Sequence, residues 1–421
     1  MWGKPQKKFF MPQTTFQELH FGPVLNACIR LNGSKSITNR VGVLSALSGN
    51  TCRLTHMAVC DDAAALQRAL TDEGEVSDIG AAGTAMRFMT AVLTLRSGGS
   101  HVLTGSARMK QRPIQILVDA LRAVGGCIEY EGVEGYPPLR IYGRRPVGGE
   151  LTMPAQVSSQ YISAMLMIGP MLERGLRLHL DGTVASRPYI DMTLRLMQRF
   201  GAEADWEADG HTLRVAPKPY VAPEAFDVEP DWSGASYWYE MVALSPDAEA
   251  RIVLPRLSAE SVQGDSAVAV WFEQLGVHTE FTPEGAVLTK CPATVERLEL
   301  NLEQQPDLAQ TLVVTAAMLN RTFRIKGLHS LRIKETDRLE ALACELGKLG
   351  YVLTVEGDDV LRWDGARNLP HYEGGIHTYD DHRMAMAFAP CAYRFDGLRI
   401  LNPEVVAKSY PEFWNDLECA K

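Results

Sequence analysis

Four stretches of the chain share one pattern of hydrophobic and polar positions. In each, apolar residues recur at helical spacing, a glycine follows, and two short apolar segments come next with a turn between them. The alternation after the glycine, as over 352–355, suits a half-buried strand. Each stretch therefore predicts an amphipathic helix, a glycine that ends it, and a pair of strands. The stretches are LVDALRAVGGCIEYEG…PLRIYG, LRLMQRFGAEADWEADGHTLRVAP, VWFEQLGVHTEFTPEGAVLTK and ACELGKLGYVLTVEGDDVLRWDG.

The glycines that end these helices recur at a nearly constant interval. Gly125, Gly201, Gly276 and Gly350 are separated by 76, 75 and 74 residues. Each stands where a helix needs a left-handed residue just past its end, which glycine supplies without steric penalty. At this interval the 421 residues hold between five and six units. Solenoid repeats are shorter, about 20–50 residues, so the pattern favours an α/β protein built by duplication.

Composition and charge narrow the class of protein. The chain is 46% hydrophobic and 22% charged, as in soluble globular proteins, and its formal net charge is −9. A duplex-binding protein usually carries a large basic face, so nucleic acid is disfavoured as a partner. No apolar stretch reaches the roughly 20 residues that span a bilayer, and the start lacks the apolar core of a signal peptide. Together these features predict a cytoplasmic protein.

The cysteines point to the same compartment. The eight cysteines contain no C-x-x-C pair and no Cys/His cluster at zinc spacing. In so long a chain, scattered cysteines are typical of reduced thiols in a reducing cytoplasm. We therefore expect free thiols, most of them in the core.

Four expected helices begin with small hydroxyl or glycine residues. These starts lie at 33–36, 80–84, 158–160 and 186–189, the last with Pro188 expected at the first helical position. A helix N-terminus exposes unpaired N–H groups and the positive end of the helix dipole, so each start could seat a phosphate or carboxylate. Ordinary capping explains any one of them alone, because the same residues are common N-caps.

Cations gather in segments that flank apolar stretches. They lie at 108–112, 332–338 and 380–383 and at Lys408. A solvated face is the usual explanation of such runs, but apolar flanks place these at element ends near a core. Arginine is favoured where a carboxylate or phosphate is held by two hydrogen bonds. The clusters therefore predict a small, multiply anionic ligand. Walker A and G-x-G-x-x-G spacings are missing, so a nucleotide cofactor has no support.

Taken in order, nine segments resemble the enolpyruvyl transferases, and within that family the EPSP synthases. The resemblance runs from about Leu31 to Trp414 and implies two inverse α/β domains, each of three repeated βα units, with the active site in the cleft between them. It implies that residues 35–230 form one domain, and that residues 1–34 with 231–421 form the other. The segments are LNGSKSITNR, GAAGTAMR, LTGSARMKQRPI, SSQY, SRPYIDMTLRLMQRFG, QPDLAQT, RIKETDRL, YDDHRMAMAF and AKSYPEF.

The resemblance also implies a reaction. The enolpyruvyl group of phosphoenolpyruvate would pass to the 5-hydroxyl of shikimate 3-phosphate through a tetrahedral intermediate, with release of phosphate, in aromatic amino-acid biosynthesis. Glu335 would act at the methylene carbon and Asp307 at the 5-hydroxyl, assisted by Lys35 and His382. Implied contacts to shikimate 3-phosphate are Lys35, Ser36, Arg40, Ser158, Ser159, Gln160, Ser186, Tyr189, Asp307 and Lys334. Implied contacts to phosphoenolpyruvate are Lys35, Gly83, Arg108, Gln160, Arg338, Arg383 and Lys408. No metal, organic cofactor, nucleic acid or membrane is implied, and we expect a monomer.

The sequence leaves departures from the family and rival functions open. The chain departs from the family's usual residues at Ala81, Phe88, Arg187, Trp232 and Ser330. The nearest rival is the sister enzyme that acts on UDP-N-acetylglucosamine, which carries a reactive cysteine where this chain has SARMKQRP. Other rivals are a non-catalytic anion-binding paralogue, a domain of a multifunctional chain, and an RNA-phosphate-processing relative. Both candidate catalytic carboxylates are present, which favours a catalyst.

Overall fold

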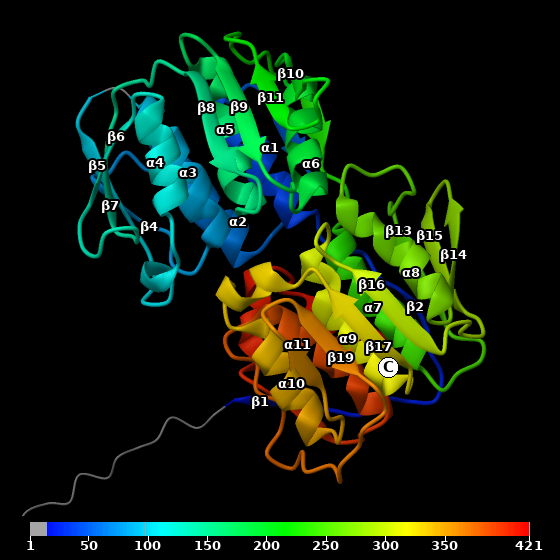
Figure 1. Ribbon diagram of the computed structural model, residues 1–421. Helices are drawn as coiled ribbons and strands as arrows, with labels where there is room; N and C mark the ends of the chain where they lie inside the picture. Colours follow the sequence, from blue (N-terminus) through cyan, green and yellow to red (C-terminus); the bar gives the residue numbers. More distant parts are fainter. Residues whose placement is uncertain (1–14, 97, 421) are drawn as a thin grey trace, which may run out of the picture.

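Four four-stranded sheets repeat one topology along the chain. The computed structural model describes residues 15–96 and 98–420, so residues 1–14 of the predicted discontinuous domain lie outside it. In each of these sheets two parallel strands are followed by a hairpin, and the second hairpin strand pairs antiparallel with the second parallel strand (Figure 1). The predicted duplication is confirmed, because one arrangement recurs four times.

Each of the four sheets places its strands in the same spatial order. One sheet contains β4 (Val76–Asp78), β5 (Ser100–Thr104), β7 (Leu139–Tyr142) and β6 (Cys127–Tyr130), and the next contains β8 (Gly149–Pro154), β9 (Leu176–Asp181), β11 (Thr212–Val215) and β10 (Ala204–Trp206). The third contains β2 (Asn26–Cys28), β13 (Arg251–Pro255), β15 (Gly285–Lys290) and β14 (Val277–Thr282), and the fourth contains β16 (Arg297–Asn301), β17 (Thr322–Lys326), β19 (Val360–Trp363) and β18 (Thr354–Glu356).

Two shorter sheets join segments that are far apart in the sequence. Strand β3 (Arg53–Thr55) pairs in parallel with β12 (Ala225–Asp227), and β1 (Phe16–Leu19) pairs antiparallel with β20 (Leu398–Leu401). The described residues thus form six sheets, four with the repeated topology and two with two strands each.

The four glycines take the backbone conformation that the pattern requires. Their φ angles are 101° at Gly125, 80° at Gly201, 98° at Gly276 and 89° at Gly350. They follow α4 (Gln115–Ala123), α6 (Arg187–Arg199), α8 (Val268–Gln274) and α10 (Arg338–Lys348). The predicted helix ends are therefore confirmed.

Six inner helices are buried on nearly every side. In one lobe these are α1 (Lys35–Leu47), α3 (Gly83–Leu95) and α5 (Ser159–Ile168), and in the other α7 (Trp232–Leu244), α9 (Ala309–Met318) and α11 (His382–Phe388). A helix with apolar residues all round belongs in a core. The remaining helices, α2 (Asp61–Thr71), α12 (Phe413–Cys419), α4, α6, α8 and α10, expose one face.

The buried residues form two large separate hydrophobic clusters. One draws its members from residues 37–228, and the other from residues 19–31 and 232–420. Between them the chain crosses twice at adjacent points: Ser34 N donates to Glu229 O at 2.8 Å, and Asp231 N donates to Asn32 O at 3.0 Å. In Figure 1 the first cluster lies in the blue-to-green lobe, and the second in the green-to-red lobe, which also carries the N-terminal strands.

The expected burial of most cysteines and the expected helical position of Pro188 were both wrong. Only Cys60 and Cys391 are buried, whereas the other six cysteines are exposed or partly exposed, because most of them lie in short strands and outer helices. Pro188 occupies the second helical position of α6 instead of the first, because Ser186 is the N-cap.

Among the described residues, no helix has the length and apolar character needed to cross a membrane.

Candidate active site between the two lobes

A cavity of about 450 Å³ lies between the lobes and brings most of the predicted site residues together. Its walls come from α1, α3, α5 and α6 on one side, and from residues 306–338 and 382–383 on the other. The predicted residues that line it are Lys35, Ser36, Arg40, Gly83, Ser158, Ser159, Gln160, Ser186, Tyr189, Asp307, Lys334, Glu335, Arg338, His382 and Arg383. Arg108 and Lys408 are not among its lining residues.

Many of these residues lie at the N-termini of the inner helices, and these N-termini are at the cavity. Helices α1, α3, α5 and α11 all begin at the cavity, and Asp307 stands just before α9. Each N-terminus presents the positive end of a helix dipole and unpaired N–H groups. Ser34 and Ser158 cap α1 and α5 by accepting from Ile37 N and Gln160 N, so at these two starts ordinary capping and a position at the cavity coexist.

Cations outnumber carboxylates around the cavity. Seven lysine or arginine side chains line it against three carboxylates, although the whole chain carries a net charge of −9. The predicted concentration of cations in an acidic protein is therefore present at this site. The seven cations are Lys35, Arg40, Arg87, Arg112, Lys334, Arg338 and Arg383, and the carboxylates are Asp62, Asp307 and Glu335.

Arg338 organises the lower wall of the cavity. It is 2% exposed, and its Nε and Nη2 donate to both oxygens of the buried Asp381, at 2.7 and 3.3 Å. Its remaining donors reach Asp307 Oδ1 at 3.2 Å and Glu335 Oε2 at 3.1 Å. Asp381 also caps α11 by accepting from Arg383 N. One guanidinium therefore fixes both candidate catalytic carboxylates in relation to α11.

The surrounding cations determine the charge of these two carboxylates. Burial opposes ionisation of Asp307 most strongly, but Arg383 at 2.8 Å and Lys334 at 3.4 Å, with Arg338, outweigh it and hold the pKa of Asp307 well below its usual range. Burial likewise opposes ionisation of Glu335, and the nearby cations, Arg338 first, hold its pKa well below its usual range. Both groups are therefore anionic at neutral pH without substrate.

Asp62 joins two cations that come from different lobes. Its carboxylate accepts from Lys35 Nζ at 3.1 Å and from Lys408 Nζ at 2.9 Å, and Lys408 also donates to Ala81 O at 2.7 Å. Burial lowers the pKa of Lys35, but Asp62, together with Cys60 and Glu335, outweighs it, so the net shift is upward. Lys408 thus lies just behind the cavity wall, within 3.7 Å of Glu335 Oε1.

Three arginines of the upper wall, Arg40, Arg87 and Arg112, form no ion pair with any carboxylate of the described residues. Arg40 donates to Thr193 Oγ1 and Ser163 Oγ at 2.7 and 3.2 Å, and burial lowers its pKa to about 10. Arg87 donates to main-chain oxygens of Gly83 and Pro113. An unpaired buried cation is costly, so these groups favour an anionic ligand.

The loop at 106–112 directs its two arginines differently. Arg108 is exposed and donates across the cleft to Glu335 O and Lys334 O, both at 3.1 Å. Arg112 lines the cavity, and its buried Nε has no hydrogen-bond partner. A Cβ atom on Gly83 would stand 2.6 Å from Arg112 Nη1, so the glycine makes room for the guanidinium. Arg112, which the sequence reasoning overlooked, therefore occupies the place expected of Arg108.

His382 is the candidate catalytic residue with no hydrogen-bond partner. It is 2% exposed and both ring nitrogens are buried without partners in the structure. Burial, followed by the charges of Lys35 and Arg383, holds its pKa well below the usual value. A neutral imidazole offers one donor and one acceptor to a ligand. Among the described residues, no group of three or more His, Cys, Asp or Glu side chains is placed to hold a metal ion.

Asp62 and Asp381 are further site residues that sequence reasoning missed. Asp62 stands in the first turn of α2, where an acidic residue is expected merely to favour the helix dipole. Asp381 stands at an N-cap, where the same applies. Their proximity to buried cations could not be read from spacing, because the partners lie 27 to 346 residues away along the chain.

The fold and the site together define a class of protein: a two-lobed α/β protein whose cation-rich cavity suits small, multiply anionic ligands. Solved structures share the fold. EPSP synthase from Acinetobacter baumannii superposes with a TM-score of 0.74 at 21% identity, covering 97% of this chain and 98% of that one. The enolpyruvyl transferase NikO from Streptomyces tendae superposes with a TM-score of 0.71 at 15% identity, covering 96% and 97%.

Sequence comparison identifies the particular family. Residues 58–417 match the family model of EPSP synthase (3-phosphoshikimate 1-carboxyvinyltransferase). The protein of that name from Bacteroides fragilis strain YCH46 is 53% identical over 396 residues, covering 94% of this chain and 95% of the relative. The one from Pasteurella multocida is 35% identical over 418 residues, covering 92% and 93%. The chain belongs to the EPSP synthase family, and the predicted fold class, family and enolpyruvyl transfer to shikimate 3-phosphate are confirmed.

Proposed function

We propose that the cavity between the lobes is the active site and that its two carboxylates divide the proton transfers. The observation that carries this proposal is the pair Asp307 and Glu335, both held by Arg338 in a cavity where cations exceed carboxylates. Phosphoenolpyruvate carries a phosphate and a carboxylate, and shikimate 3-phosphate carries a phosphate, each phosphate with about two charges near neutral pH. The excess of cations over carboxylates around the cavity can neutralise the negative charge of both substrates.

In the addition step, the 5-hydroxyl oxygen bonds to the central carbon of phosphoenolpyruvate. Asp307 accepts the hydroxyl proton, while Glu335, entering the step protonated, gives a proton to the methylene carbon. In the elimination step, Glu335 takes a proton back from the new methyl group, the C–O bond to phosphate breaks, and the departing phosphate receives the proton held by Asp307. Each step conserves protons, and neither requires a redox partner.

Substrate charge supplies the change of pKa that Glu335 needs. In the free enzyme the neighbouring cations keep its pKa well below the usual value. Bound phosphoenolpyruvate brings negative charge against the same cations and so raises the pKa of Glu335 toward protonation. We assign phosphoenolpyruvate to the cations at Arg112, Arg338 and Arg383 and to Lys408, with Gly83 and Gln160 beside it. Lys35 and the neutral His382 assist at the phosphate.

Shikimate 3-phosphate is assigned to the wall formed by α1, α5 and α6. Its phosphate is proposed to meet the hydroxyl-rich helix starts and the unpaired Arg40, and its ring hydroxyls to meet Asp307 and Lys334. The residues assigned to this substrate are Lys35, Ser36, Arg40, Ser158, Ser159, Gln160, Ser186, Tyr189, Asp307 and Lys334. Arg108 is proposed to close the loop at 106–112 over the cleft through its bonds to Lys334 O and Glu335 O.

The remaining assignments concern organisation and setting. We propose that residues 35–230 form one domain, and residues 1–34 with 231–421 the other. The two hydrophobic clusters and the adjacent crossings at Ser34 and Asp231 support these boundaries. We propose a monomer, because both walls of the site come from one chain. We propose a cytoplasmic location, because the eight cysteines are free thiols.

A phosphate-release assay tests the function. We expect release from phosphoenolpyruvate only when shikimate 3-phosphate is added, and none when UDP-N-acetylglucosamine replaces it. Asp307→Asn keeps the size of the side chain and removes its basicity, so turnover should fall by about 10²–10⁴-fold while shikimate 3-phosphate still binds. Absence of release with shikimate 3-phosphate would refute the proposed function, and loss of binding in the folded variant would limit Asp307 to a binding role.

A further inference from the structure

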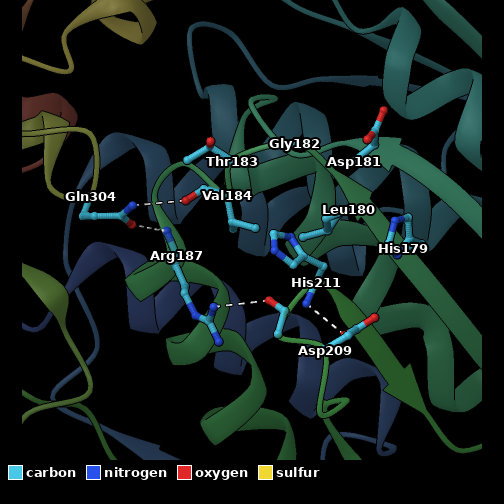
Figure 2. A pocket seen from close by; sticks show the side chains of 11 residues that line it. His179, Leu180, Asp181, Gly182, Thr183, Val184, Arg187, Asp209, His211 and Gln304 are labelled. Carbon is cyan, nitrogen blue, oxygen red and sulfur yellow. Dashed lines mark hydrogen bonds between the residues drawn. The ribbon is translucent and has the colours of Figure 1, made fainter.

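Gln304 spans the boundary between the lobes at a second cavity. This cavity, of about 780 Å³, lies at the ends of β9 and β11 and the start of α6 in the upper lobe (Figure 2). Gln304 comes from the opposite lobe, between β16 and α9, and lines the same cavity. Figure 2 shows its side-chain amide directed at the main chain of Val184 and Arg187. The contact therefore joins two segments that belong to different hydrophobic clusters.

Four hydrogen bonds between residues 303–304 and residues 184–187 enclose Ser186. Gln304 Nε2 donates to Val184 O at 3.1 Å, and Gln304 Oε1 accepts from Arg187 N at 2.8 Å. In addition, Ser186 N donates to Glu303 O at 3.0 Å. A carbonyl on one side and an N–H on the other determine which way the amide faces. The opposite lobe thus holds the main chain directly before, at and after Ser186.

The conformation of Ser186 needs such external support. Its φ is 54°, in the left-handed region that is sterically unfavourable for a non-glycine residue. Its hydroxyl makes no capping bond to α6, although Ser186 is the N-cap, and donates instead to Glu303 O at 3.5 Å. The residue itself lines the substrate cavity. At the start of α6 the main-chain N–H groups of Ser186 and Arg187 come first, and the next residue, Pro188, has no N–H. Both of these N–H groups are occupied by residues 303–304.

On the far side of the turn, Arg187 is held within its own lobe. Its guanidinium stacks over Trp206 at 4.1 Å from the ring centroid and donates to Gly210 O at 3.3 Å. The Arg187 side chain therefore anchors the start of α6 in its own lobe, whereas the main chain at 184–187 is bonded to the opposite lobe. Tyr189, in the first turn of α6, also donates to Asp265 Oδ1 of the opposite lobe at 2.8 Å. Moving the lobes apart would release the turn at 184–186 and break this second contact, while the Arg187 side chain stays in place.

We propose that Gln304 is a positioning residue, which couples approach of the lobes to placement of the Ser186 hydroxyl at the shikimate 3-phosphate site. The inference rests on the proposed assignment of Ser186 to that substrate. It goes beyond that assignment because it gives Gln304, a residue of the opposite lobe, a role in positioning a group that binds the substrate phosphate. Binding of shikimate 3-phosphate and closing of the two lobes then favour each other through this turn.

Replacement of the Gln304 amide tests the proposal in the full chain. Gln304→Met keeps the length of the side chain and removes both hydrogen bonds, so we expect the Kd for shikimate 3-phosphate, measured by titration calorimetry, to rise about tenfold. Gln304→Glu keeps the acceptor for Arg187 N but turns a carboxylate oxygen toward Val184 O, so it should weaken binding at least as much. Gln305→Met is the matched control, since Gln305 lines neither cavity, and should stay within about twofold.

A double-mutant cycle separates positioning from a general structural effect. If Gln304 acts through Ser186, the double variant with Ser186→Ala should bind no more weakly than Ser186→Ala alone. Fully additive losses, or normal affinity in Gln304→Met while Ser186→Ala weakens binding, would overturn the role of Gln304 and leave the proposed site intact. Normal affinity in Ser186→Ala would instead refute the assignment of Ser186, and the coupling with it. Thermal melting without substrate checks that each variant is folded.

Discussion

The two arginines of the loop at 106–112 offer a direct test of how the site holds phosphoenolpyruvate. Arg112 lines the cavity beside Gly83 and has no carboxylate partner among the described residues. Arg108 makes exposed hydrogen bonds to two main-chain oxygens. A hydrogen bond to a charged group contributes about 1.5–3 kcal/mol. Arg112→Gln should therefore raise the KM for phosphoenolpyruvate by about 10- to 150-fold.

The assay is steady-state phosphate release with phosphoenolpyruvate varied at saturating shikimate 3-phosphate. Arg108→Gln is the matched control, from the same loop and with the same change of charge, and its KM should rise by less than about tenfold because exposed polar contacts contribute little. A KM within twofold of the unmodified chain for Arg112→Gln, or a larger effect for Arg108→Gln, would refute the assignment of Arg112 to this substrate.

Three further predictions concern turnover, pH dependence and folding. Glu335→Gln should lower kcat by about 10²–10⁴-fold with little change in the Kd for shikimate 3-phosphate, and unchanged turnover in single-turnover experiments would exclude Glu335 as the proton donor. Asp62→Asn removes the charge that raises the pKa of Lys35, so the alkaline limb of kcat/KM should move to lower pH; an unmoved limb in the pH–rate profile would contradict this. Gly350→Ala puts a side chain at φ 89° and 2.6 Å from a main-chain oxygen, and should cost about 1–3 kcal/mol in urea unfolding. Gly347→Ala, with nothing within 4 Å, should instead stabilise α10 by up to about 1 kcal/mol; equal midpoints for the two variants would count against the cap.

Local patterns predicted the repeated unit well, because both of its signals are local. A glycine after an amphipathic helix specifies a left-handed residue, and Gly125 and Gly350 adopt it at φ 101° and 89°. The hairpin that follows is indicated by alternation over four to six residues. Such features depend on neighbours in sequence, and so the duplication could be read without any knowledge of packing.

The site was only partly accessible to the same reasoning. Ordered motifs placed Asp307, Glu335 and Arg338 correctly around one cavity. They did not distinguish Arg108 from Arg112, since both lie in one short loop and only the path of that loop past Gly83 decides which guanidinium faces inward. They also passed over Asp62, which resembles an ordinary first-turn acid until Lys408 of the other lobe is found beside it.

By itself, then, the sequence determined the helices, their glycine ends and the repeat, because these follow from periodicity and backbone sterics. The family of reaction came from the resemblance of nine ordered segments to the enolpyruvyl transferases. Tertiary structure alone decided which charges meet. Six inner helices direct their N-termini toward the boundary between the lobes, and the chain crosses that boundary twice. Asp62 takes part of its pKa shift from Lys408 of the opposite lobe, and Arg338 takes its shift from Asp381, Glu335 and Asp307, which the packing of its own lobe brings together. Electrostatic interaction depends on distance and burial in space and not on separation along the chain.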